Sequence, residues 1–156
     1  MAMSNNAKNM KTDALLRLCW LAANEEAKHL GAVAIEPVHF LLGVLKIADP
    51  EFPKRLETSD VSSAEWAAMC KAACNIRHYL DIIPEKVADK RRRLRAKLAA
   101  KRTRPPEAQS GMLHRSKELK RAFHDACLFT DGDTLTLRTL VQSLFELELV
   151  SLDDIK

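Results

Sequence analysis

The sequence predicts an all-α protein that forms a single domain. Glycine and proline are scarce, with 4 Gly and 6 Pro in 156 residues, so the chain lacks the frequent turns of a β-sandwich. Apolar residues recur at helical spacing, and Ala, Leu, Lys, Arg and Glu, which favour helices, are abundant. Hydrophobic residues make up 47% of the chain. A chain of this length buries about 68–70% of its unfolded surface, so it needs no metal or disulfide to fold.

The first half predicts three helices. Thr12 is a suitable N-cap for the first, which Gly31 ends because glycine takes the left-handed conformation at little steric cost. Pro37 suits the first turn of the second helix, whose leucines would pack into the core. A third helix is expected to run to about Leu80, with an apolar stripe of Trp66, Met69, Ala73, Ile76 and Leu80.

The second half predicts a similar pair of helices. An amphipathic run begins at Ser116, and a turn follows at Asp131–Asp133. The alternation over Thr134–Leu140 is typical of a strand, but the apolar spacing beyond it favours a helix from about Thr136. A long helix, a turn and a Leu-rich helix thus occur twice, and we expect each copy to cover an apolar face of the other. The two copies are Thr12–Ile47 and Ser116–Glu148.

A strongly basic segment separates the two halves. Glu85–Arg104 holds ten Lys or Arg and two acidic residues, whereas the whole chain has a formal net charge of +4, so the remainder is net negative. Val87, Leu94 and Leu98 are too few apolar residues to anchor a core helix, which leaves a solvated helix or a mobile strap. We use the name basic strap for its cationic side chains Arg91, Arg92, Arg93, Arg95, Lys97, Lys101 and Arg102.

Three roles are open for the basic strap. The first is a solvated linker, and the second is an electrostatic dock for an acidic protein partner. The third is binding of a nucleic-acid phosphate backbone through residues 86–104. No aromatic residue is interleaved there on which a base could stack, so such binding would be non-specific and strongly salt-dependent.

Two stretches of each half resemble a known family. Glu25–Lys28 reads EEAK and Ile35–Leu45 reads IEPVHFLLGVL, and together they resemble the first repeat of the Clp N-terminal domain. His114–Phe123 and Leu140–Phe145 resemble its second repeat. The resemblance implies an all-α double helical repeat with a pseudo-twofold axis. Repeat one would span about residues 12–80, a basic linker residues 84–111, and repeat two about residues 114–148.

The resemblance also implies a function. Such domains stand at the front of AAA+ unfoldases and disaggregases, where they bind substrate or adaptor proteins. We therefore expect a non-catalytic protein–protein interaction module, with an AAA+ ATPase in the same chain or as a separate partner. The 156 residues contain no G-x-x-x-x-G-K-[ST] phosphate loop, so they do not hydrolyse ATP by that mechanism.

The contact surface that the resemblance implies lies at the starts of the two Leu-rich helices. In the first it comprises Glu36, Val38 and His39, and in the second Arg138 and Thr139. Many family members carry Glu before the His of this motif, and in some this acid recognises phosphoarginine. Val38 and Arg138 occupy these positions here, so we expect no phosphoarginine recognition, which needs the acid.

Other candidate sites are better explained by structure. Cys70, Cys74 and His78 share a helical face, but three residues over two turns do not meet at one ion, so no metal is expected. His39 has no evident nucleophile beside it, and we expect it to hydrogen-bond at the helix start. Trp66 and the remaining two cysteines are expected to pack in the core; these are Cys19 and Cys127.

Several classes of function are excluded or less favoured. No apolar run approaches 18 residues, so we expect no membrane span, and Met1–Lys11 lacks the apolar region of a secretory signal. Free thiols then suggest the cytoplasm. A small hydrolase would need a nucleophile motif, which the sequence lacks, and no cofactor is expected. The main alternative to protein binding is therefore nucleic-acid association through the basic strap.

Overall fold

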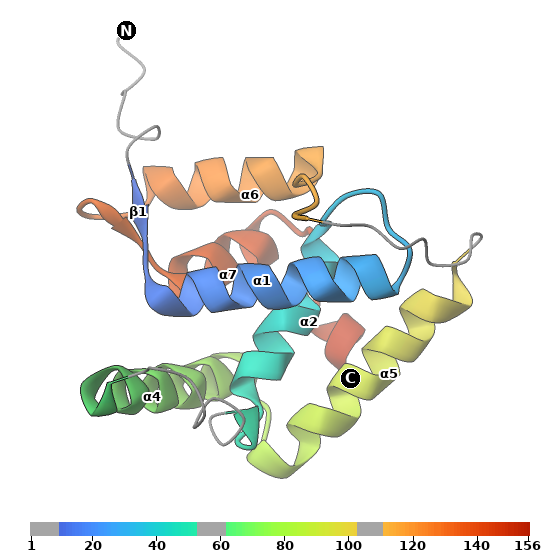
Figure 1. The fold of residues 1–156 in the computed structure, drawn as a ribbon, viewed down its shortest axis with the longest axis horizontal. Coiled ribbons are helices and arrows are strands. Elements are labelled where there is room, and N and C mark those ends of the chain that lie inside the picture. The colour runs from blue at the N-terminus through green and yellow to red at the C-terminus, as the bar shows by residue number, and fades with distance from the viewer. Residues whose placement is uncertain (1–9, 53–61, 103–110) are drawn as a thin grey trace, which may run out of the picture.

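The computed structural model describes residues 10–52, 62–102 and 111–156, and it confirms that the protein is mostly helical. Figure 1 shows α6 at one end of the molecule and α4 at the other, with α2 running between them and α1 lying across α2. The elements are β1 (Lys11–Thr12), α1 (Ala14–His29), α2 (Pro37–Ala48), α4 (Ser63–Leu80), α5 (Val87–Ala100), α6 (Lys117–Leu128), β2 (Thr134–Leu135) and α7 (Leu137–Glu146). A short 3₁₀ helix, η2 (Pro84–Lys86), precedes α5, and another, η3 (Leu152–Ile155), follows α7.

The ends of α1 follow local sequence signals, with one correction. Its N-cap is Asp13 rather than Thr12, because the Asp13 carboxylate accepts a hydrogen bond of 2.7 Å from the Leu16 amide. At the other end Gly31 takes φ +70°, as predicted. The Gly31 amide donates to the Lys28 carbonyl and the Ala32 amide to the Ala27 carbonyl, which is a Schellman motif.

Helix α2 is the buried centre of the fold. Most of its side chains are buried, and it packs closely on α1, where Gly43 makes the approach possible. A Cβ added at Gly43 would lie 2.8 Å from the Cys19 carbonyl oxygen and 3.2 Å from the Ala23 nitrogen. Since both atoms belong to backbone, neither can move without shifting α1. The largest fully buried side chains of the whole core include Phe40, Leu16, Ile35, Leu41, Leu42, Leu119, Leu137 and Leu140.

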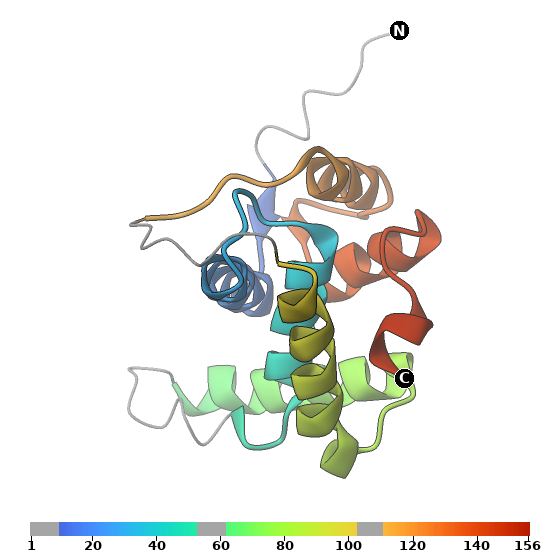
Figure 2. The same cartoon turned by 90° about the vertical axis from the view of Figure 1, so that its right-hand side faces the viewer.

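The basic segment forms the helix that was one of the two expected alternatives, but one face of it packs on this core, which corrects the expectation that its apolar residues are too few to anchor it. It forms α5, which packs along α2 (Figure 2). Val87 and Leu94 are buried in the main core cluster, and Leu98 packs against it. Val87 and Leu94 lie about two turns apart on one face of the helix, and this face anchors α5 on the core. Residues 103–110 of the predicted linker lie outside the described part of the chain.

The two halves of the chain are joined by parallel backbone pairings that mirror each other. The segment before α1 pairs with the segment before α7, with Lys11 opposite Thr134 and Thr12 opposite Leu135. The segment before α2 pairs with the segment before α6, where Ile35 is opposite Arg115. In each half, the segments that precede the first and the second helix thus both pair with segments of the other half.

The ambiguous stretch 134–140 contains both structures that its pattern suggested. Thr134 and Leu135 form β2, and the helix then begins as predicted, because Thr136 caps α7 by accepting from the Thr139 amide. Helix α4 ends at Leu80, also as predicted. No helix in the described ranges is long and apolar enough to cross a membrane.

Gly43→Ala provides a test of the α1–α2 packing. Helix propensity alone predicts a gain of about 1 kcal/mol in the free energy of unfolding. The backbone contacts of the added Cβ predict instead a loss of about 1–3 kcal/mol. We expect the loss, measured by urea denaturation, and a stabilised variant would contradict the close approach of α1 and α2.

Candidate functional site

The first part of the predicted contact surface is only partly accessible. Glu36 is exposed and Val38 is half-buried, but His39 is buried. The Glu36 amide donates a hydrogen bond of 2.9 Å to Nδ1 of His39, so this histidine serves at the helix start, as expected. Burial lowers the pKa of His39 from 6.5 to about 4, although the Glu26 carboxylate opposes the shift. His39 therefore supports α2 from within rather than contacting a partner.

The second part of the predicted surface lies elsewhere. Arg138 is exposed, and Thr139 is half-buried with its hydroxyl 3.0 Å from that of Thr136. Arg138 lines a hollow between α1, α4 and α7, whereas Glu36 and His39 line a separate one near the end of α5. The two hollows share no lining residue. The five predicted contact residues therefore do not form one continuous site.

An apolar groove runs along α4, and we call it the α4 groove. One part, of about 220 Å³, lies between the starts of α1 and α7 and the second half of α4. The other part, of about 480 Å³, continues between α1 and the first half of α4. Both parts share Asp13, Leu15 and Ala72, so they form one continuous depression. Its main apolar lining residues are Leu15, Leu18, Leu21, Met69, Ala72, Ile76, Leu137 and Val141.

In the described part of the chain α4 packs mainly against α2, and the groove lies where α4 faces α1 and α7. Met69, part of the predicted apolar stripe, is half-buried: it packs against the core cluster and also lines the groove. Trp66 is likewise half-buried. Leu21 is 53% exposed and Tyr79 is 44% exposed, one in each part of the groove. Apolar side chains gathered on a concave surface are typical of a binding site.

The basic strap is divided between structural and exposed cations. The Arg95 guanidinium donates two hydrogen bonds to the buried Glu26 carboxylate, with Nε 3.0 Å from Oε2 and Nη2 bonded to Oε1. Arg93 forms a more exposed pair with Asp89, with Nε 3.0 Å from Oδ2. The other strap residues differ in exposure: Arg91 is half-buried, and Arg92, Lys97, Lys101 and Arg102 are exposed.

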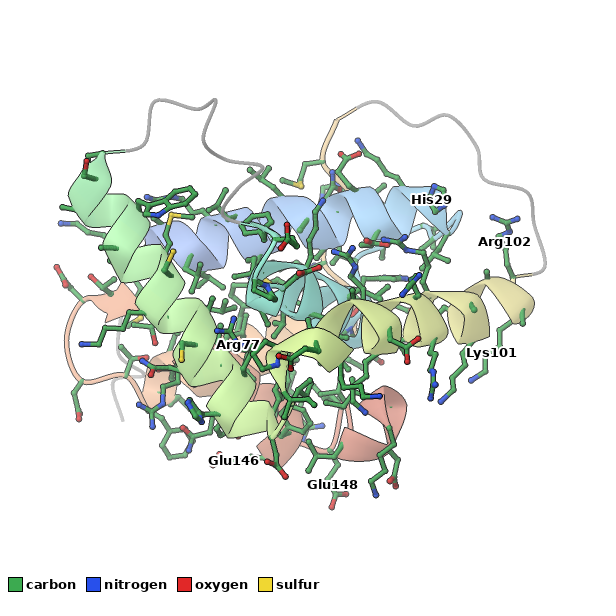
Figure 3. The ribbon with its side chains drawn as sticks, turned by 90° about the horizontal axis from the view of Figure 1, so that it is seen from below. His29, Arg77, Lys101, Arg102, Glu146 and Glu148 are labelled. Carbon is green, nitrogen blue, oxygen red and sulfur yellow. The ribbon has the colours of Figure 1, made fainter. Side chains whose placement is uncertain are left out.

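The exposed cations near the end of α5 lie beside the second hollow. Figure 3 places Lys101 and Arg102 there, at the end of the molecule where His29 closes α1. Lys101 and Arg102 line the hollow of about 560 Å³ together with Glu36. An exposed carboxylate therefore faces the same space as these two cations.

The cysteines show no sign of a metal centre. Cys19 is buried and its thiol lies 3.7 Å from the Phe40 carbonyl oxygen, which confirms its interpretation as a core residue. Cys70 and Cys74 are half-buried, and Cys127 is half-buried beside the core. Among the residues that the structure describes, no group of three or more His, Cys, Asp or Glu could hold a metal ion.

Sequence reasoning missed two interactions. One is the Glu26–Arg95 pair, which joins residues 69 positions apart. Its signal was available, since Glu26 falls on the same helical face as the buried Cys19, Ala22 and Ala23. The other is the Arg115 guanidinium, which lies 5.0 Å from the ring centre of Trp20 and 4.6 Å from that of Phe123.

No family model, curated protein or solved structure matches the chain. The α4 groove and the charges around it are therefore the basis for any functional proposal.

Arg95→Gln tests whether the strap has a structural role. The substitution leaves the buried Glu26 carboxylate without its partner, so we expect the free energy of unfolding to fall by about 3 kcal/mol. Arg93→Gln is the matched control, because its pair with Asp89 is more exposed and is worth less than about 0.5 kcal/mol. Equal and small losses in urea denaturation would show that Arg95 does not hold α5 to α1.

The His39 ring predicts a dependence of stability on pH. Its pKa is lower in the folded protein, so the unfolded chain binds a proton that the folded chain does not between pH 6.5 and about 4. The contribution of His39 to the free energy of unfolding is therefore fully present above pH 6.5. It falls by about 3 kcal/mol as the pH decreases toward 4. His39→Gln keeps an acceptor for the Glu36 amide without the titration, so we expect it to lose this part of the slope.

The matched control for His39 is His29→Gln. His29 is exposed in the last turn of α1, so this variant should keep the wild-type slope in denaturation at a series of pH values. A His39→Gln variant with the wild-type slope would contradict the assignment.

Proposed function

We propose that this chain is a non-catalytic protein-interaction module that binds an apolar segment of a substrate or adaptor protein in the α4 groove. The observation that carries the proposal is the groove itself, a continuous apolar depression across α1, α4 and α7. Helix-in-groove and extended-segment recognition both use such a surface, with apolar anchors of the partner filling the depression. The groove uses both halves of the chain, so the binding site depends on the complete fold.

The mirrored backbone pairings support the resemblance to a Clp N-terminal double repeat. In each half, one segment precedes a first helix and another precedes a second helix, and each pairs with the opposite kind of segment in the other half. A pseudo-twofold axis relating α1 and α2 to α6 and α7 accounts for this pattern. On this proposal the partner that receives the bound segment is an AAA+ ATPase, in the same chain or a separate one, in the cytoplasm.

The polar groups of the groove favour binding over catalysis. Asp13 caps α1, and the Thr136 hydroxyl caps α7. The remaining polar lining residues are Arg17, Asn75, Tyr79 and Arg138. Because nucleophilic catalysis needs a nucleophile beside a base, these groups suit the orientation of a ligand better than its conversion.

The structure favours the groove over the basic strap as the site of function. Arg95 is committed to Glu26, and Arg93 pairs with Asp89, so these two cations are partly neutralised. Counterion release from nucleic acid scales with the number of phosphates that a protein neutralises, and each committed arginine reduces that number. Nucleic-acid binding through residues 86–104 is therefore the weaker proposal.

Leu21→Gln tests the α4 groove with casein as an unfolded protein ligand. Leu21 is more than half exposed, so the variant should remain folded, which a thermal melt verifies. Loss of one apolar anchor costs about 1.5 kcal/mol, so we expect the dissociation constant to rise about tenfold.

Leu128→Gln is the matched control for this test, because Leu128 is 67% exposed at the end of α6, outside the groove. It should bind casein as the wild type does. Absence of binding by the wild type, or equal effects of the two substitutions, would contradict the proposal.

A further inference from the structure

The α7 end of the α4 groove carries hydrogen-bond donors that the fold does not use. Arg138 lies in the first turn of α7 and is exposed, and no ion-pair partner for it occurs within residues 10–52, 62–102 and 111–156. The Asn75 amide and the Tyr79 hydroxyl line the same part of the groove from α4. Burial and the Glu146 carboxylate raise the pKa of Tyr79, and the nearby Arg138 guanidinium opposes that shift. The side chains of Arg138, Asn75 and Tyr79 thus place hydrogen-bond donors at the edge of an apolar hollow.

Two carboxylates lie near this end of the groove. Asp13 lines the hollow, but its carboxylate accepts from the Leu16 amide at the N-terminus of α1, where the helix dipole favours a negative charge. Glu146 does not line the groove, and its carboxylate accepts a hydrogen bond of 2.8 Å from Gln142. Figure 3 shows Glu146 at the far end of α7. The side chains that line this hollow thus include two charged groups: the Asp13 carboxylate, which caps α1, and the Arg138 guanidinium, which has no ion-pair partner in the described ranges.

A second guanidinium gives the groove the same sign of charge. Arg17 lines the part between α1 and α4, and its Nη1 donates a hydrogen bond of 2.7 Å to the Thr12 carbonyl oxygen. That bond involves a neutral acceptor, so it leaves the positive charge of Arg17 uncompensated. The groove therefore combines apolar walls with two cations and one carboxylate that caps a helix.

Given the proposed protein-binding role of the α4 groove, we infer that the groove selects an apolar segment flanked by an Asp or Glu side chain, whose carboxylate binds Arg138. A guanidinium binds a carboxylate through two parallel hydrogen bonds, and the apolar walls reduce the competition from water. The N-terminus of α7, one residue before Arg138, adds to the positive potential. Charge complementarity thus identifies the occupant as an acidic and apolar segment rather than a basic one.

The experiment uses three synthetic peptides that share one apolar run of Leu and Phe. Both ends are blocked, so no terminal charge contributes, and the residues on each side of the run are Glu, Gln or Lys. Placing the variable residue on both sides makes the test independent of the direction in which the peptide lies. Fluorescence anisotropy gives the dissociation constant of each peptide for the full chain.

We expect the Glu peptide to bind the wild type about tenfold more tightly than the Gln peptide, and the Lys peptide to bind most weakly. In Arg138→Gln the ratio of the Glu and Gln affinities should fall to about one, within a factor of about two. Arg121→Gln is the matched control, because Arg121 is exposed on α6 away from the groove, and it should keep the tenfold ratio.

The outcomes separate this inference from the proposed function. Equal binding of the three peptides to the wild type would overturn the acidic preference while leaving the groove as a protein-binding site. An acidic preference that survives in Arg138→Gln would overturn the role of that side chain. Failure of all three peptides to bind would overturn both proposals. A fourth peptide serves as a control: it has only Gln beside the run and an unblocked C-terminal carboxylate. If it binds with the affinity of the Glu peptide, the requirement for an acidic side chain is overturned.

Discussion

The crossed backbone pairing of the two halves is the constraint on which the rest of this structure depends. The segments that lead into α1 and α2 obtain hydrogen-bond partners from the segments that lead into α7 and α6. Ile35 and Leu135 are buried, and an unpaired backbone group in a buried position is costly, so each half stabilises the start of the other. The pairing also fixes the distance between the first turns of α1 and α7, which form one wall of the α4 groove. The fold and the α4 groove thus have a common origin.

A second constraint holds the basic strap against this frame. Helix α5 is highly cationic, yet it lies along α2 because Val87 and Leu94 enter the core and Arg95 binds the buried Glu26. A buried carboxylate is costly unless it is paired, so this interaction specifies where α5 must lie. The strap residues therefore differ in role: Arg95 stabilises the fold, and the exposed strap residues face solvent. The apolar depression lies along α4 rather than along the strap.

Most helices could be predicted from the sequence because their signals are local. Gly31, Pro37 and Thr136 act through their own backbone conformation or through neighbours one turn away, and the corresponding helix boundaries agree with the structure. The packing of α5 on α2 and the presence of the α4 groove could not be predicted from such local signals. The presence of Val87 and Leu94 on a basic helix does not by itself indicate that α2 packs against them. Similarly, the stripe of α4 has the same spacing whether a neighbouring helix covers Met69 or leaves it in an open groove.

The central claim is that the two halves are paired into one unit. Hydrogen exchange at four backbone amides is its most direct test. The Lys11 and Asp13 amides donate across the pairing to Asp133 and Leu135, and the Ile35 and Ser116 amides donate to His114 and Ile35. If the halves form a single cooperative unit, these amides exchange only through global unfolding, at the rate of the amides of α2. Protection factors near one at these four positions, with α2 still protected, would show that the halves are not joined as described.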